Sequence, residues 1–238
     1  MSLVRSVATV GGYTGISRIL GFVRDILIAN AVGASPVADA FFAAFRLPNL
    51  FRRLFAEGAF NAAFVPLFAK ELEGEGARQA RRFAEEALAA LLFALVALTA
   101  LAEIAMPLFM VVLAPGFVEE PGKFDLAVLL TRITFPYLIF VSLVALLSGV
   151  LNALSRFAAA AFAPALLNAV LIVSLLLIHA LELDGSEQAG IYLSVGVFFA
   201  GVAQLVMLVI AARRVGMGLS LRRPRMTPGI RRLITLGI

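Results

Sequence analysis

Apolar residues recur along this chain in blocks long enough for a helix to cross a bilayer. Six blocks cover residues 7–32, 37–68, 88–113, 126–151, 157–181 and 189–212, and a seventh begins at Leu233. A spanning helix needs ~20 apolar residues, whereas barrel strands show ~10-residue alternating segments. The pattern predicts an all-α polytopic membrane protein with six transmembrane helices and the start of a seventh.

Composition supports this class. Of 238 residues, 62% are hydrophobic and 15% are charged, and the mean hydropathy is +1.00. An ordinary soluble domain is ~45–50% apolar and ~25% charged, so a conventional soluble enzyme and a disordered chain are both excluded. The chain has no Cys, which excludes a disulfide framework, a thiolate metal site and a Cys nucleophile.

The net charge of +5 is distributed unevenly between the two sides of the predicted bundle. One side carries eleven basic residues: Arg5, Lys70, Arg78, Arg81, Arg82, Arg156, Arg213, Arg214, Arg222, Arg223 and Arg225. The connections on the other side carry only Lys123. The positive-inside rule places the N-terminus in the cytoplasm, so the charge predicts topology and needs no nucleic-acid partner. Residues 1–215 are predicted to form a six-helix lobe, and residues 216–238 a basic cytoplasmic linker with the start of span seven.

The first span contains ions that a lipid-facing helix tolerates poorly. Arg18, Arg24 and Asp25 interrupt its apolar run, and each costs roughly 2.5–3.5 kcal/mol at a helix centre. At ~100° per residue they share one stripe with Ser17 and Gly21, and the rest of the surface is apolar. These side chains are therefore predicted to face protein or water.

The second span repeats this design. Pro48 predicts a kink, after which one helical face carries Asn49, Arg52, Arg53 and Glu57. Before it, Asp39 and Arg46 also share a face. The first span runs outward and the second returns inward, so the two are predicted to be adjacent and antiparallel. The guanidiniums of Arg18, Arg24 and Arg52 are then predicted to converge near the midplane.

Two interpretations of these ions remain open. The acids could neutralise the cations internally, as structural ion pairs. Between residues 18 and 57, however, five Arg face three acids, which leaves a surplus of two positive charges. The planar fork of Arg suits phosphate oxygens, so the surplus predicts a cationic cavity for a phosphorylated or otherwise anionic substrate.

Several motifs resemble those of the MurJ (MviN) family of lipid II flippases. They are SRILGFVRD at 17–25, ADAFF at 38–42, RLPNL at 46–50, RRLFAEGAF at 52–60, FVP at 64–66, APGF at 114–117, TFPY at 134–137 and APALLN at 163–168. The likeness covers nearly the whole chain and is most specific in the first seventy residues.

The resemblance implies one lobe of a multidrug/oligosaccharidyl-lipid/polysaccharide exporter, located in the bacterial cytoplasmic membrane. It implies that the substrate is lipid II, a prenyl diphosphate-linked disaccharide-pentapeptide, moved between leaflets by alternating access without a cofactor or enzymatic step. By motif match, Arg18, Arg24 and Arg52 would bind the diphosphate. The other implied positions are Ser17 and Asp25 at the substrate, and Asp39, Asn49, Arg53 and Glu57 at the gate or cavity wall.

The family has about fourteen spans, so the resemblance also implies a second lobe outside this sequence and favours a fragment of a longer product. Two alternatives stay open: another exporter of lipid-linked oligosaccharides, and a membrane enzyme that processes prenyl phosphates. The sequence offers no obvious catalytic residues for the enzyme. The only His, His179, lies at a predicted membrane edge, and Asp25 and Asp39 stand on opposite halves of the pocket.

Overall fold

A computed structural model describes residues 3–52 and 59–237, and every regular element within these ranges is helical. The longer helices are α1 Leu3–Val32, α2 Pro36–Arg52, α3 Ala59–Gly74, α4 Ala77–Leu113, α5 Pro121–Thr134, α6 Tyr137–Ala153, α7 Phe157–Ala180 and α8 Glu187–Arg214. A 3-10 turn, η2 Pro115–Glu119, joins α4 to α5, and a short helix, α9 Pro228–Gly237, follows α8. The all-α prediction is confirmed.

Two of the predicted spans are each built from two helices. The block at 37–68 comprises α2, which continues through Pro48 to Arg52, and α3, which begins at Ala59. The block at 126–151 comprises α5 and α6, separated at Phe135 and Pro136. Proline has no N–H to donate and its ring crowds the preceding turn, which explains this second break.

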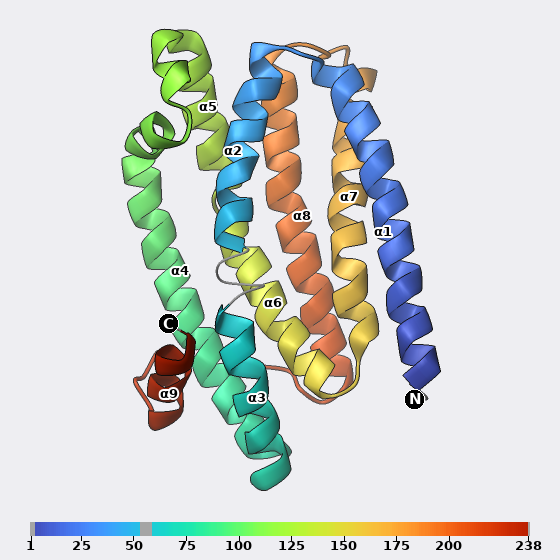
Figure 1. Ribbon diagram of the computed structural model, residues 1–238, viewed down its shortest axis with the longest axis vertical. Helices are drawn as coiled ribbons and strands as arrows, with labels where there is room; N and C mark the ends of the chain where they lie inside the picture. The colour runs from blue at the N-terminus through green and yellow to red at the C-terminus, as the bar shows by residue number, and fades with distance from the viewer. Residues whose placement is uncertain (1–2, 53–58, 238) are drawn as a thin grey trace.

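The helices stand roughly parallel to one long axis (Figure 1). Helix α1 packs along α7, α7 packs on α8, and α2 packs on α5, α8 and α6. The tight turn at residues 33–35 joins α1 to α2 at one end, called here the turn end. The opposite end, called the α9 end, holds α9, the α3–α4 turn and the beginning of α1 (Figure 1).

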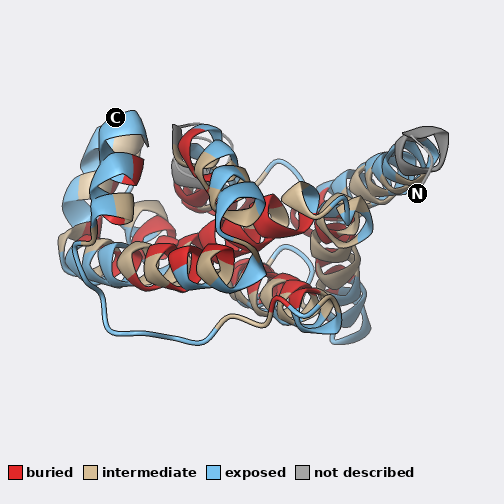
Figure 2. Ribbon diagram, turned by 90° about the horizontal axis from the view of Figure 1, so that it is seen from below, coloured by how far each residue is buried: buried red, intermediate tan, exposed pale blue. Residues whose placement is uncertain are grey.

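Two buried clusters hold the bundle together. One includes Phe41, Met106 and Leu130, and the other includes Phe64 and Leu147. Viewed along the bundle, buried residues lie on the inward sides of the helices and exposed ones on the outward sides (Figure 2).

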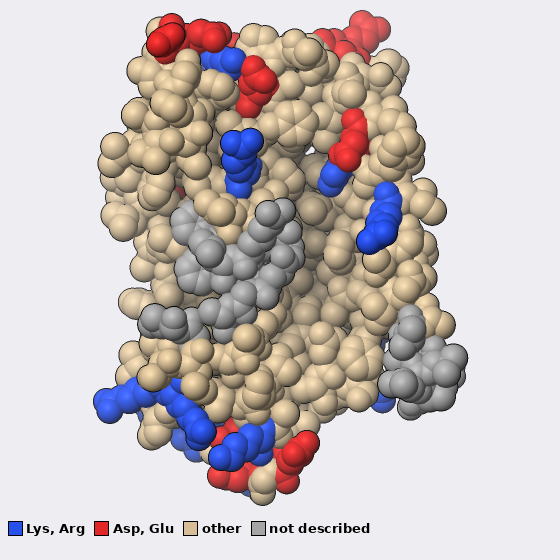
Figure 3. Space-filling view, in the orientation of Figure 1, with Lys and Arg blue, Asp and Glu red and all other residues tan. Residues whose placement is uncertain are grey.

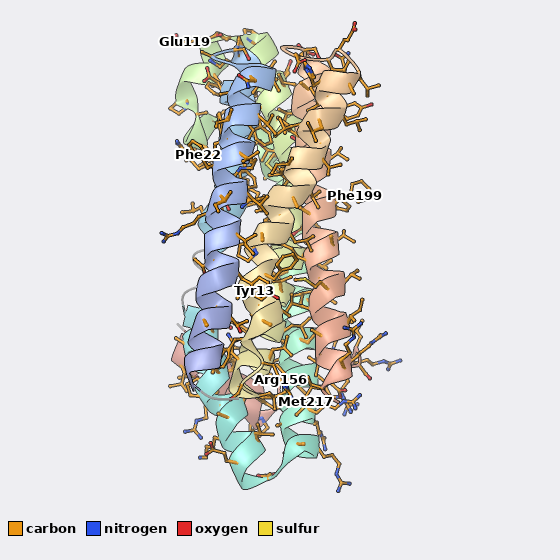
Figure 4. The ribbon with its side chains drawn as sticks, turned by 90° about the vertical axis from the view of Figure 1, so that its right-hand side faces the viewer. Tyr13, Phe22, Glu119, Arg156, Phe199 and Met217 are labelled. Carbon is orange, nitrogen blue, oxygen red and sulfur yellow. The ribbon has the colours of Figure 1, made fainter. Side chains whose placement is uncertain are left out.

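Much of the outer surface is apolar, as a lipid-facing surface must be. Phe22 on α1 and Phe199 on α8 point away from the bundle, with 69% and 57% of their surface exposed (Figure 4). Among the described residues, four segments are long and apolar enough to cross a membrane: Ala77–Leu113, Pro121–Ala153, Phe157–Ala180 and Glu187–Arg214. The described parts of α2 and α3 are shorter and α1 carries its ions, so the count of six spans stays a prediction.

The segment after α8 is fastened to α4 by two carboxylates. Buried Glu85 accepts hydrogen bonds from Arg81 Nε at 3.1 Å, from the Ser220 backbone N–H at 3.0 Å and from Arg222 Nε. Glu86 accepts from the Thr227 hydroxyl at 2.8 Å, next to the start of α9. The residues predicted to begin a seventh span form α9, which packs on α3 and α4 through buried Ile230 and Leu233.

We expect Glu85→Gln to loosen this segment without unfolding the bundle. Charge-assisted hydrogen bonds contribute about 1.5–3 kcal/mol, so losing the charge should make local opening roughly thirtyfold more frequent. Limited trypsin digestion at Arg222, Arg223 and Arg225 measures this opening. The matched control is Glu73→Gln, an exposed acid on α3. Equal cleavage of the two variants would show that Glu85 does not hold the segment.

Candidate anion-binding cavity

A cavity of about 570 Å³ opens between α1, α2, α3, α6, α7 and α8. Its wall is unusually rich in polar groups for the interior of an apolar bundle. The cation Arg24 shares this wall with the side chains of Asn49, Asn61, Ser148, Asn168 and Gln204. A water-accessible pocket of this kind can hold a polar substrate within the bundle.

Arg24 is held in place from two directions. Its Nη1 donates to Asn168 Oδ1 at 2.7 Å, and its Nε and Nη2 donate to Asp25 Oδ1 at 3.0 and 2.7 Å. A guanidinium has five N–H donors, so two remain beyond these three contacts. Arg24 is therefore oriented and still able to bind an anion in the cavity.

Asn168 links the two helices on which this arrangement depends. Its Nδ2 donates to the Ser17 carbonyl at 2.9 Å, and a Cβ added at Gly21 would lie 3.4 Å from the same Nδ2. A Cβ at this position would therefore meet the amide at ordinary van der Waals distance. The sequence did not predict the contact of Asn168 with Arg24.

Two further amides are fixed by neighbouring groups. Asn49 Nδ2 donates to the Phe45 carbonyl at 3.0 Å, one turn earlier on α2. Buried Gln204 on α8 donates to the Ala163 carbonyl at 2.7 Å and accepts from the Tyr137 hydroxyl at 3.4 Å. Asn49 was predicted at the cavity wall and lies there, whereas Gln204 was not identified from the sequence.

The other predicted site residues fall into three groups. Ser17 and Asp25 adjoin the Arg24 contacts, while Arg18 is exposed and has no ion-pair or hydrogen-bond partner among the described side chains. Arg52 ends α2, but its side chain lies outside the described part of the chain. Arg53 and Glu57 lie outside the described residues altogether.

The expectation that the first two spans pack side by side is wrong. Helix α1 makes its main contact with α7, whereas α2 packs mainly on α5 and α8. Asn168 on α7 joins the two helices by its hydrogen bonds with Arg24 and with the Ser17 carbonyl on α1. Arg24 and Asn49 consequently line the cavity from different helices, and the convergence of three guanidiniums stays a prediction.

Asp39 lies near the turn end and is neutralised by a residue from another helix. The Lys123 ammonium lies 2.7 Å from the Asp39 carboxylate and 3.7 Å from that of Glu120. It also lies 4.5 Å from the centre of the Phe117 ring, a cation–π distance. Lys123 was recognised from the sequence only as a loop cation, because its partner is more than eighty residues earlier in the chain.

These contacts answer the question of internal neutralisation for the described side chains. Asp25 pairs with Arg24 and Asp39 pairs with Lys123, so neither acid neutralises Arg18 or Arg46. Figure 3 shows basic side chains gathered at the α9 end and a few isolated ones between the two ends, on the face of α1 and α2. The isolated ones agree with a cavity face that is partly cationic.

A second intramembrane pair lies apart from the cavity. Arg132 on α5 donates through Nε to the Glu103 carbonyl on α4 at 3.3 Å. Neither residue lines the cavity. The contact therefore joins α5 to α4 away from the candidate site.

Apolar helices packed around a polar, Arg-bearing cavity are the architecture of a polytopic helical membrane protein. The family described as "Lipid II flippase MurJ" matches residues 28–238. The chain belongs to the MurJ family.

Individual relatives agree with this assignment. The chain is 52% identical over 239 residues to a probable lipid II flippase MurJ of Rhizobium tropici, covering all of this chain and 45% of the relative. It is 40% identical to the lipid II flippase MurJ of Burkholderia cenocepacia, over 98% of this chain and 45% of that protein. The chain thus spans a little under half the length of these relatives.

A solved structure confirms the fold. The structure titled "Lipid II flippase MurJ, inward closed conformation" matches with a TM-score of 0.74 and 24% sequence identity, over 96% of this chain and 45% of that one. The chain therefore spans a little under half the length of that structure as well.

Proposed function

We propose that this lobe forms part of a flippase that moves lipid II from the inner to the outer leaflet of the bacterial cytoplasmic membrane. The observation that carries the proposal is Arg24, oriented at the cavity wall by Asn168 and Asp25 with N–H donors to spare. Arg18, exposed and unpaired among the described side chains, adds a second cation on the same helix. Together with Arg52, they would bind the diphosphate.

Transport by this route needs binding and conformational change, not covalent chemistry. The diphosphate would sit in the cavity while the prenyl chain stays in lipid. A second lobe would close the open side of the cavity, and rocking of the two lobes would expose the substrate to one leaflet and then the other. Ser17, Arg53, Glu57 and the pair of Asp39 with Lys123 are proposed as cavity or gate positions in that cycle.

The charge distribution supports one orientation. The α9 end carries Arg213, Arg214 and the arginines of the segment that follows α8, whereas the turn end carries Glu119 and Glu120. In Figure 4, Glu119 lies at one extreme of the molecule, and Arg156 and Met217 lie towards the other. By the positive-inside rule the α9 end and the N-terminus would face the cytoplasm.

Reconstitution tests the proposal directly. The natural gene product containing this chain is placed in vesicles with fluorescent lipid II, and an impermeant quencher is added outside. We expect the label in the inner leaflet to become accessible with the wild-type protein and to stay protected with Arg24→Ala. Equal protection in wild-type vesicles and protein-free vesicles would contradict a lipid II flippase.

The same assay distinguishes transport of lipid II from export of other lipid-linked oligosaccharides. An exporter of other lipid-linked oligosaccharides would move a prenyl diphosphate sugar without a peptide as fast as lipid II. For this protein, we expect the peptide-free lipid to be moved more slowly than lipid II.

A further inference from the structure

Arg46 on α2 is a second unpaired cation that the diphosphate site does not use. Its side chain is exposed and has no ion-pair or hydrogen-bond partner among the described residues. It lines one hollow together with Phe42, Phe45 and Asn49. It also lines an adjacent hollow with Asp39 and Phe42.

The acid nearest to Arg46 along α2 has another partner. Asp39 is the one acid of α2 and lines the same hollow as Arg46. The Asp39 carboxylate is instead bound at 2.7 Å by Lys123, which also contacts Glu120 and the Phe117 ring. Among the described side chains, the positive charge of Arg46 is thus left without a compensating acid.

Arg46 lies at about the depth of Arg24 but around the helix from the main cavity. At ~1.5 Å per residue, Arg46 is ~15 Å from the start of α2 and Arg24 is ~12 Å from the end of α1, measured from the same turn. Phe45 and Asn49 line both the Arg24 cavity and the Arg46 hollow, so the two spaces are neighbours. A lone guanidinium at this depth is costly against lipid and calls for an anion or water.

We propose that Arg46 binds a carboxylate of the peptide carried by the lipid-linked substrate. This inference rests on the proposed function. A prenyl diphosphate disaccharide-pentapeptide carries two kinds of anion, the phosphates and the peptide carboxylates. Arg24 is oriented for the first, and Arg46 can bind the second in the bidentate geometry that guanidinium and carboxylate share. The Phe42 and Phe45 rings offer an apolar wall for the aliphatic parts of the peptide.

Binding of two lipids distinguishes the two anions. Lipid II and the same prenyl diphosphate disaccharide without its peptide are titrated against the full-length protein by native mass spectrometry. We expect Arg46→Gln to weaken lipid II binding about tenfold and to leave the peptide-free lipid unchanged, since a charge-assisted pair is lost only in the first. Lys123→Gln, which frees Asp39 towards Arg46, should cause the same selective loss. The matched control is Arg78→Gln, an exposed Arg at the α9 end.

Each other outcome overturns the assignment. Equal weakening of both lipids by Arg46→Gln would assign a phosphate to Arg46 in place of a carboxylate. No change with either lipid, while Arg24→Ala weakens both, would remove Arg46 from the site but keep the proposed function. If wild-type protein binds neither lipid, the proposed function fails together with this inference.

Discussion

Cells that depend on the Arg24→Ala variant of the full-length protein are expected not to grow, although the variant inserts into the membrane normally. Arg24 is the described cation that lines the cavity, and Asn168 and Asp25 already hold it in a binding orientation. Truncating one partner of a desolvated charge pair typically costs 2–5 kcal/mol. We therefore expect lipid II affinity to fall at least about thirtyfold, measured by native mass spectrometry beside the growth test.

The position of Asp25 makes a second variant necessary. In Arg24→Ala the Asp25 carboxylate loses its partner, and its free negative charge would itself repel a diphosphate. The double variant Arg24→Ala with Asp25→Asn removes both charges. We expect it to stay inactive, with affinity between that of Arg24→Ala and that of the wild type. Normal growth of either variant, at wild-type protein levels, would sink the assignment of Arg24 to the diphosphate.

The pattern of apolar and polar residues predicted the helices well, because each apolar block reflects the surroundings of its own segment. The stripe on α1 placed Arg24 and Asp25 on one face; Arg24 lines the cavity, and the exposed Asp25 pairs with it. The pattern could not show that Pro136 divides one block into α5 and α6, since membrane helices often continue through proline.

Tertiary partners were harder to predict, because they join residues far apart in the chain. Asn168 accepts a hydrogen bond from Arg24, which lies 144 positions earlier in the chain. Lys123, which follows α4 in the chain, pairs with Asp39, which precedes α4. A wheel of α1 shows that its ions share a face but not which helix that face meets. The assumption that consecutive helices pack together therefore placed α1 beside α2, where the structure places it along α7.

The second large effect is expected at Asn168, which contacts Arg24 across the bundle. This amide is 6% exposed and joins Arg24 Nη1 to the Ser17 carbonyl. Asn168→Leu keeps a side chain of similar size against Gly21 but removes both hydrogen bonds. The guanidinium then keeps only Asp25, on its own helix, and loses the contact that fixes it against α7.

We expect Asn168→Leu to weaken lipid II binding about tenfold, because a positioning contact of roughly 1.5 kcal/mol is lost while the cation itself remains. The discriminating measurement is a double-mutant cycle. If Asn168 acts by orienting Arg24, then Asn168→Leu should cause little further loss in an Arg24→Ala background, since coupled residues are not additive. Asn152→Leu, at an exposed Asn on α6, controls for loss of an amide elsewhere in the bundle. An additive tenfold loss in the Arg24→Ala background would instead mean that Asn168 contacts the substrate or supports the fold independently of Arg24.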